Sequence, residues 1–136
     1  MYPLGRHVLF ELYDCDPDLL KNVDVVRDQM VEAARRAQAT IVAVTFHEFS
    51  PIGVSGVVVI STSHMSIHTW PEHRYAAVDI FSCGEVVQPQ VAIDYLSRAF
   101  VAERVSVVEL HRGILVEDSG KHRGTEAQEK FQVRPV

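Results

Sequence analysis

Apolar residues recur every three or four positions in two stretches of the chain, and this spacing predicts two helices that each rest one face on a core. In the first stretch, after Asn22, they are Val23, Val26, Met30, Ala33, Ala34 and Ala37. In the second, which opens with Pro89, they are Val91, Ala92, Tyr95, Leu96, Ala99 and Phe100. Proline is favoured in the first turn of a helix, which supports this start. Asp16 before Pro17 predicts a further short, capped helical turn.

Shorter stretches of five to seven residues are rich in apolar and β-branched side chains, and they predict strands. These are His7–Tyr13, Thr40–Phe46, Val54–Ile60, Ser66–Trp70, Tyr75–Phe81 and Val105–Leu110. A turn at residues 71–74 separates the fourth from the fifth, and the sixth is expected to be the last. The second is apolar at both alternating sets of positions, so we expect it to be buried on both sides.

The order of these elements predicts the fold class. Consecutive strands with short connections favour antiparallel pairing. We therefore expect an α+β, two-layer sandwich: a largely antiparallel sheet with two helices on one face. Several strands are apolar on both faces, which predicts that a second copy of the chain covers the other face of the sheet.

Composition and charge narrow the class of protein. The 136 residues suffice for one domain, expected over residues 1–116, and the polar residues 117–136 are expected to form a mobile tail. A net charge of −5 argues against a basic surface that binds nucleic acid or an anionic membrane. No apolar run is long enough to span a bilayer, and the first seven residues contain no apolar stretch of the kind found in signal peptides. Because only two cysteines occur, we expect a reducing, cytoplasmic location.

Candidate chemistry gathers between residues 61 and 73, where three of the seven histidines accompany several hydroxyl residues and the tryptophan. His64 and His68, with Cys83 from the next strand, could bind zinc, although a single His-x3-His spacing is weakly specific. Ser63 beside a histidine could be a hydrolytic nucleophile, although no G-x-S-x-G surrounds it. Alternatively, the serines cap turns and the histidines are half-buried in a sheet.

Five sequence blocks, in order over about residues 5–112, distinguish these alternatives. They read Gly5-Arg6-His7, Phe46-His47-Glu48-Phe49, Gly53-Val54-Ser55-Gly56-Val57, Ser63-His64-x-x-Ile67-His68-x-x-Pro71-Glu72 and Tyr75-Ala76-x-Val78-Asp79-x-Phe81-x-Cys83-Gly84. As a set they resemble the prokaryotic S-adenosylmethionine decarboxylases. That resemblance implies an α+β sandwich that dimerises into a four-layer αββα arrangement, with an active site shared across the homodimer.

The resemblance also implies that the chain makes its own cofactor. Members of that family cut themselves before a serine, here between Thr62 and Ser63, giving fragments 1–62 and 63–136. The serine becomes a pyruvoyl group that forms a Schiff base with the substrate, so neither pyridoxal phosphate nor a metal is expected. Where members usually carry Glu before this serine, the chain has Thr62, which removes a negative charge beside the cleavage site.

Further residues match functional positions of that family. By resemblance, His68 accepts the Ser63 α-proton during processing and Ser55 assists this step. Cys83 corresponds to the proton donor in decarboxylation. Phe49 lies in a segment that lines the substrate site and could stack on adenine, and Glu72 could bind the ribose hydroxyls.

The implied substrate is S-adenosylmethionine, whose decarboxylated product supplies aminopropyl groups for spermidine biosynthesis. Two alternatives stay open. The same machinery could decarboxylate a free basic amino acid such as arginine or ornithine. An uncleaved homologue could instead serve as a non-catalytic partner or binding module.

Overall fold

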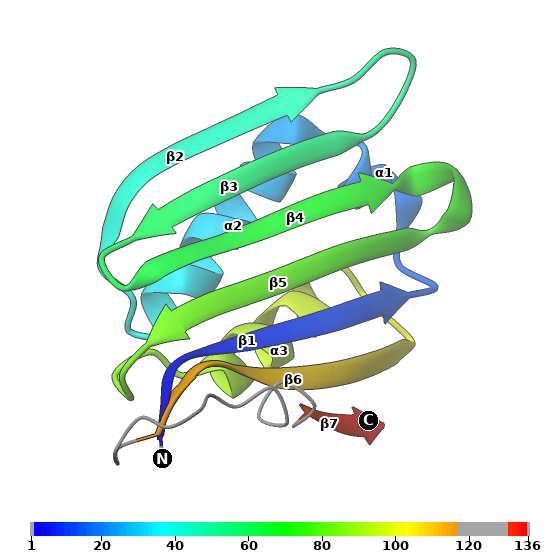
Figure 1. Ribbon diagram of the computed structural model, residues 1–136. Coiled ribbons are helices and arrows are strands. Elements are labelled where there is room, and N and C mark those ends of the chain that lie inside the picture. Colours follow the sequence, from blue (N-terminus) through cyan, green and yellow to red (C-terminus); the bar gives the residue numbers. More distant parts are fainter. Residues whose placement is uncertain (1, 117–130, 136) are drawn as a thin grey trace.

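A computed structural model describes residues 2–116 and 131–135 of the chain as one antiparallel sheet with helices on one side (Figure 1). The strands are β1 (Tyr2–Tyr13), β2 (Ile41–Glu48), β3 (Val54–Ile60), β4 (Ser63–Trp70), β5 (Tyr75–Cys83), β6 (Arg104–Leu115) and β7 (Phe131–Pro135). Their order across the sheet is β2-β3-β4-β5-β1-β6-β7. The helices are α1 (Pro17–Leu20), α2 (Val23–Arg36) and α3 (Pro89–Ala99), with a 3-10 turn, η1 (Pro71–His73). The predicted α+β sandwich is confirmed.

The helices begin where the sequence pattern places them. Asn22 caps α2, because its side-chain oxygen accepts from the backbone N–H groups of Asp24 and Val25 at 3.0 and 3.1 Å. Asp16 caps α1 in the same way through Asp18. Pro89 occupies the first turn of α3. Each of these helices therefore begins at a residue whose chemistry favours a helix start.

The core lies between the helices and the sheet. Strand side chains alternate between the two faces, and those that face the helices are buried. The helices contribute Val26, Met30, Ala33, Ala34, Ala92, Ile93 and Leu96. The strands contribute Val8, Phe10, Leu12, Val54, Val58, Met65, Ile67, Val78 and Ile80. One face of the sheet is thereby covered by the helices.

The expectation that the second strand is buried on both sides is wrong. In β2, Val42 is 64 % exposed and Val44 is 38 % exposed. The physical reason is the position of β2 at the edge of the sheet, where it pairs only with β3. A strand that is apolar on both faces is usually central in a sheet, so the sequence of β2 led to the wrong prediction for an edge strand.

The sixth strand is not the last, because β7 pairs antiparallel with β6. The tail expected over residues 117–136 therefore contains a strand at Phe131–Pro135, and its residues 117–130 lie outside the described residues. Other strands are longer than expected: β1 begins at Tyr2, β4 at Ser63, and β5 runs to Cys83.

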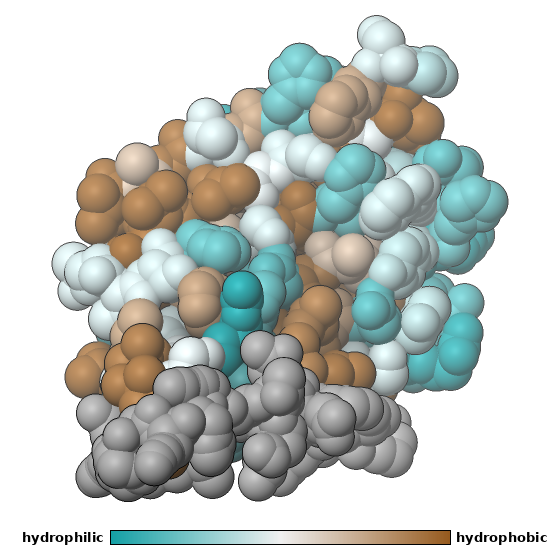
Figure 2. Space-filling model, in the orientation of Figure 1, coloured by the Kyte–Doolittle hydropathy of each residue, from teal (hydrophilic) through white to brown (hydrophobic). Residues whose placement is uncertain are grey.

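The second face of the sheet, called the open face from here on, carries no helix in the described residues. Figure 2 views this face and shows apolar side chains interspersed with polar ones, with a brown group over the left ends of β2 and β3. Val59, at 39 % exposure, belongs to that end of β3. Among the described residues, no helix is both long and apolar enough to cross a membrane.

Candidate active site on the open face

Alternation along β4 separates its core residues from its candidate chemistry. The positions that face the helices are Met65, Ile67 and Thr69, all buried. The positions on the open face are His64, Ser66, His68 and Trp70, all partly exposed. The two histidines of the proposed zinc pair therefore share a face, as expected, but lie roughly 13 Å apart at 3.3 Å per residue.

The bond between Thr62 and Ser63 lies in a tight hairpin turn. Ile60 of β3 pairs with Ser63 of β4, so that residues 61 and 62 alone connect the two strands. The Ser61 N–H donates to the Thr40 carbonyl at 2.9 Å, which ties this turn to the segment before β2. The Thr62 hydroxyl oxygen is buried and has no hydrogen-bond partner within the described part of the chain.

Around Ser63 lies a group of polar side chains from three strands, called the Ser63 cluster: Ser63, His64, Asp79 and His7. The Ser63 hydroxyl oxygen is 3.3 Å from Nδ1 of His64. Nε2 of His64 is 3.6 Å from Oδ2 of Asp79, and Nε2 of His7 is 2.6 Å from the same oxygen. The Ser66 hydroxyl donates to the other oxygen of Asp79.

Cys83 lies at the same end of the sheet as this cluster. It is exposed at the end of β5 and faces Gly5 of β1. Because His64 pairs with Phe81 in the β4–β5 register, continuing that register by two residues brings Cys83 beside Thr62. The other cysteine, Cys15, is buried, and desolvation first, then the neighbouring Asp14, raises its pKa to about 12. Cys83 is therefore the accessible thiol.

A second group, called the His68 cluster, occupies the opposite end of the open face. It consists of His68, Ser55, Phe49 and Trp70. Ser55 faces His68 across the β3–β4 ladder, and its hydroxyl oxygen shares a hydrogen bond with His68 Nδ1 at 2.5 Å. The His68 ring packs on Trp70 and Phe49, with centroids 4.1 and 5.9 Å away.

Glycine at position 56 makes room beside the His68 cluster. A Cβ atom there would lie 1.9 Å from the Phe46 ring. The ring of Phe46 can therefore lie flat over the backbone next to Ser55 only because residue 56 has no side chain. Glu72, the remaining predicted site residue, is exposed in η1, directly after β4.

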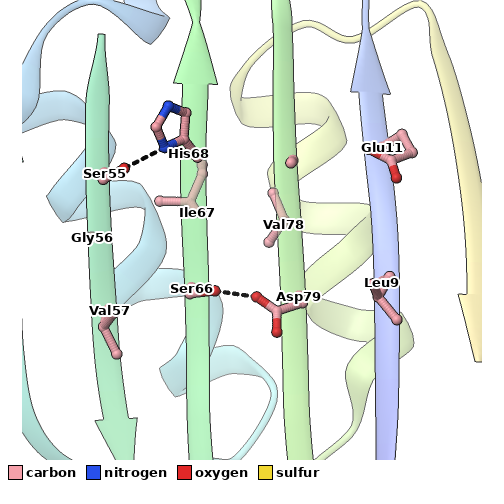
Figure 3. A pocket seen from close by; sticks show the side chains of 11 residues that line it. Leu9, Glu11, Ser55, Gly56, Val57, Ser66, Ile67, His68, Val78 and Asp79 are labelled. Atoms are coloured by element: carbon pink, nitrogen blue, oxygen red, sulfur yellow. Dashed lines mark hydrogen bonds between the residues drawn. The ribbon is translucent and has the colours of Figure 1, made fainter. Parts of the chain in front are cut away.

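Between the two clusters the open face is hollowed. Figure 3 shows this hollow, with the Ser55–His68 hydrogen bond at one end and the Ser66–Asp79 hydrogen bond at the other. Its volume is about 380 Å³, and Leu9, Glu11 and Ala77 contribute to its lining. Tyr75 donates a hydrogen bond to Glu11, and burial followed by this bond raises the pKa of Tyr75.

The predicted site residues thus fall into two groups instead of one. Ser63 and Cys83 lie at one end, whereas Ser55, His68, Phe49 and Glu72 lie toward the other. Ser63 and His68 are five positions apart along β4, or roughly 16 Å at 3.3 Å per residue. Within a single chain, His68 is therefore out of reach of Ser63.

The only metal-binding set found among the described residues differs from the one the sequence suggested. His64, His68 and Cys83 do not converge, whereas ligand atoms of His7, His64 and Asp79 all lie within 4.8 Å of one another. Arg112 donates to Nδ1 of His7 at 3.3 Å. This contact leaves the proton on Nε2, where a metal would have to bind, so the set is better suited to hydrogen bonding than to zinc.

His7 and Asp79 were missed as functional residues by the sequence reasoning. Both lie in sequence blocks that carried the family resemblance, but no spacing rule relates positions 7 and 79. Only the antiparallel register of β1 with β5, in which His7 faces Phe81 and Leu9 faces Asp79, brings them together. Their polar character at open-face positions of otherwise apolar strands is the one signal that could have identified them.

Comparisons with known proteins identify a consistent set of relatives. The family model described as S-adenosylmethionine decarboxylase matches residues 6–113. An S-adenosylmethionine decarboxylase proenzyme of Thermodesulfovibrio yellowstonii is 48 % identical over 133 residues, covering 98 % of both chains. One of Thermotoga maritima is 55 % identical over 113 residues, 83 % of this chain and 87 % of the relative. The crystal structure of the adenosylmethionine decarboxylase from Aquifex aeolicus has 36 % identity and a TM-score of 0.81, covering 89 % of this chain and all of that one.

Proposed function

Because the chain belongs to the S-adenosylmethionine decarboxylase family, we propose that it is a proenzyme that cuts itself between Thr62 and Ser63 and then decarboxylates S-adenosylmethionine for spermidine biosynthesis. The observation that carries this proposal is the position of Ser63. It is the first residue of β4, directly after the tight turn, and its hydroxyl oxygen is 3.3 Å from an imidazole nitrogen, at the same sheet end as the exposed Cys83. A carboxy-lyase of this family needs such a serine as the precursor of its cofactor.

Ser63 fits the chemistry of self-cleavage. Its hydroxyl oxygen attacks the Thr62 carbonyl carbon and converts the amide into an ester. Removal of the Ser63 α-proton then expels Thr62 as a carboxylate, and the dehydroalanine left at position 63 hydrolyses to a pyruvoyl group and ammonia. Serine is required because its oxygen must first become the ester oxygen and then leave. When formed, the pyruvoyl group supplies a carbonyl that binds the substrate amine and accepts the electrons released with carbon dioxide.

The residues of the chain supply proton transfer around that group. In our proposal His68 accepts the Ser63 α-proton during elimination, and the Ser55 hydroxyl, bonded to His68 Nδ1, holds the imidazole in place. Cys83 donates a proton to the substrate carbon after carbon dioxide has left. Its exposure and its place beside the Thr62–Ser63 turn support this role.

The 16 Å between Ser63 and His68 within one chain supports a shared site. We propose that two copies pack their open faces together about a two-fold axis, giving a four-layer αββα homodimer. An axis that runs across the strands would place the His68 cluster of one copy over the Ser63 cluster of the other. The open face suits this packing, because Leu9, Val57 and Val108 leave apolar surface partly exposed on it.

Substrate recognition in this proposal comes from the end of the open face that holds the His68 cluster. Phe49 is 42 % exposed, and its ring is available to stack on the adenine of S-adenosylmethionine. Glu72 presents a carboxylate that can accept hydrogen bonds from the ribose hydroxyls. Both residues reach the pyruvoyl position only if a second copy supplies them.

The test is the intact mass of the purified protein together with carbon dioxide release. We expect fragments 1–62 and 63–136, the second beginning with a pyruvoyl group, and release from labelled S-adenosylmethionine but not from arginine or ornithine. Ser63→Ala should stay intact and inactive. An unbroken chain with an ordinary serine would refute the proposal and favour a non-catalytic homologue. Release from arginine or ornithine alone would refute the substrate.

A further inference from the structure

The Ser63 cluster contains an arrangement that the roles assigned so far do not use. The Ser63 hydroxyl oxygen is 3.3 Å from Nδ1 of His64. Nε2 of the same ring is 3.6 Å from a carboxylate oxygen of Asp79. We infer that His64 is the base that takes the Ser63 hydroxyl proton in the first step of self-cleavage, and that Asp79 positions it. This inference rests on the proposed self-cleavage and assigns the step that precedes elimination.

Asp79 selects the form of His64 that this step requires. Oδ2 of Asp79 lies 3.6 Å from Nε2 of His64, beyond hydrogen-bond distance, but its negative charge favours a proton on that nitrogen and so leaves Nδ1 free to accept from the Ser63 hydroxyl. Asp79 is itself held on both of its oxygens, by the Ser66 hydroxyl on one and by His7 Nε2 on the other. Arg112 fixes His7 in turn by donating to its Nδ1. The carboxylate is therefore oriented before the reaction begins.

His68 cannot serve the same step within its own chain. It lies roughly 16 Å along β4 from Ser63, and its Nδ1 is already bonded to Ser55. The two steps of processing remove protons from different atoms, the hydroxyl oxygen and the α-carbon. The structure provides two imidazoles in two settings, so His64 serves the hydroxyl from the same chain and His68 serves the α-carbon.

The step balances without any co-reactant. Nδ1 of His64 takes the hydroxyl proton while the Ser63 oxygen bonds to the Thr62 carbonyl carbon. The bond between that carbon and the Ser63 nitrogen then breaks, and the proton on Nδ1 passes to the departing amine. The products are an ester at Ser63 and a free amino group, with His64 returned to its starting form.

The experiment isolates this step by blocking the next one. In His68→Ala, elimination stops, so the ester accumulates, and hydroxylamine should split the chain after Thr62. In the double variant His64→Ala, His68→Ala, we expect hydroxylamine to split the chain about 10²–10⁴-fold more slowly, the range that a positioned proton acceptor contributes. Equal rates of splitting in the two proteins would overturn the inference.

Single variants separate a chemical role from a structural one. His64→Ala and His64→Gln, each shown folded by circular dichroism, should both self-cleave slowly, and added imidazole should restore part of the rate to His64→Ala. Asp79→Asn should slow cleavage and Asp79→Glu should regain part of it. The control His73→Ala removes an exposed histidine outside the cluster and should cleave at the original rate. Wild-type cleavage by His64→Gln would also overturn the inference.

The inference and the proposed function fail in different ways. If the unaltered chain never cleaves, the proposed function fails and no variant is needed to show it. If the unaltered chain cleaves and decarboxylates S-adenosylmethionine while His64→Ala processes at the same rate, only the role of His64 is wrong.

Discussion

The two ends of the open face differ in what they bring to a reaction. The Ser63 cluster is polar: a carboxylate is hydrogen-bonded to one imidazole and one hydroxyl and lies 3.6 Å from a second imidazole. The His68 cluster is aromatic, with one hydroxyl–imidazole pair packed among the rings of Trp70 and Phe49. In our proposal the first end breaks a peptide bond, and the second holds a flat ring system.

Neither end suffices alone. The Ser63 cluster has the proposed nucleophile but little surface for a nucleoside, whereas the His68 cluster has aromatic surface, and its serine, Ser55, lies within β3 and not beside a turn. A roughly 16 Å separation along one strand keeps them apart in a single chain. The difference supports our proposal that the chain carries two half-sites, which association of two copies would complete.

The largest expected effect comes from mixing two inactive chains. Ser63→Ala lacks the nucleophile and His68→Ala lacks the partner for elimination, so neither homodimer should complete processing. If sites are shared between copies, a mixed dimer holds one complete site, and the His68→Ala chain in it should be cut. Coexpression with different tags, followed by intact mass, measures this recovery.

The matched control for this mixture replaces His68→Ala by His64→Ala. We infer that His64 acts on Ser63 of its own chain. A mixed dimer of the His64→Ala chain and the Ser63→Ala chain should therefore leave both chains uncut for far longer. Recovery in neither mixture, despite isolated mixed dimers, would show that each chain holds its complete site. Recovery in both would place His64 across the interface.

A smaller but still large effect is expected at the Ser63 end for Cys83→Ala. Self-cleavage should proceed, because the thiol takes no part in it, while decarboxylation should fall roughly 10²–10⁴-fold through loss of the proton donor. Carbon dioxide release by the cleaved protein measures the loss. The control is Cys15→Ala, which removes the buried thiol and should keep its turnover.

The two thiols can also be separated by pH. Because burial raises the pKa of Cys15 to about 12, that thiol stays protonated, and hence unreactive, at pH 8. Iodoacetamide at pH 8 should therefore label Cys83 and stop turnover while sparing Cys15. Turnover that survives complete labelling of Cys83 is incompatible with its role as proton donor.

The fold could be predicted from the sequence wherever burial follows the period of an element. The apolar faces of α2 and α3 and their starts at Asn22 and Pro89 come directly from residue spacing and capping chemistry. The edge position of β2 could not be predicted, because its apolar sequence resembles that of a central strand. β7 was missed because a five-residue strand after a polar stretch carries little periodic signal.

For the candidate site, too, the features that are local in sequence could be predicted and those that depend on strand pairing could not. Ser63, His68, Ser55 and Cys83 could be proposed from motif blocks, since each block is local in sequence. Their distribution over two ends could not, because the distance along a strand and the face of each side chain follow only from register. Asp79 and His7 depend on register entirely: 72 positions separate them in sequence, and 2.6 Å separates their polar atoms.

The smallest expected effect concerns the aromatic end and sharpens its assignment to substrate binding. Phe49→Leu keeps an apolar side chain of similar reach but removes the ring that would stack on adenine. Aromatic stacking contributes about 0.5–1.5 kcal/mol beyond buried area, so KM for S-adenosylmethionine should rise about 2- to 10-fold. Self-cleavage should change little, because Ser63, His64 and Asp79 are untouched and the Ser55 hydroxyl still holds His68, and kcat should also change little. Steady-state carbon dioxide release by fully processed protein separates these constants. A fall in kcat at constant KM would instead place Phe49 with the reacting groups, and the contrast between a cutting end and a holding end would then be wrong.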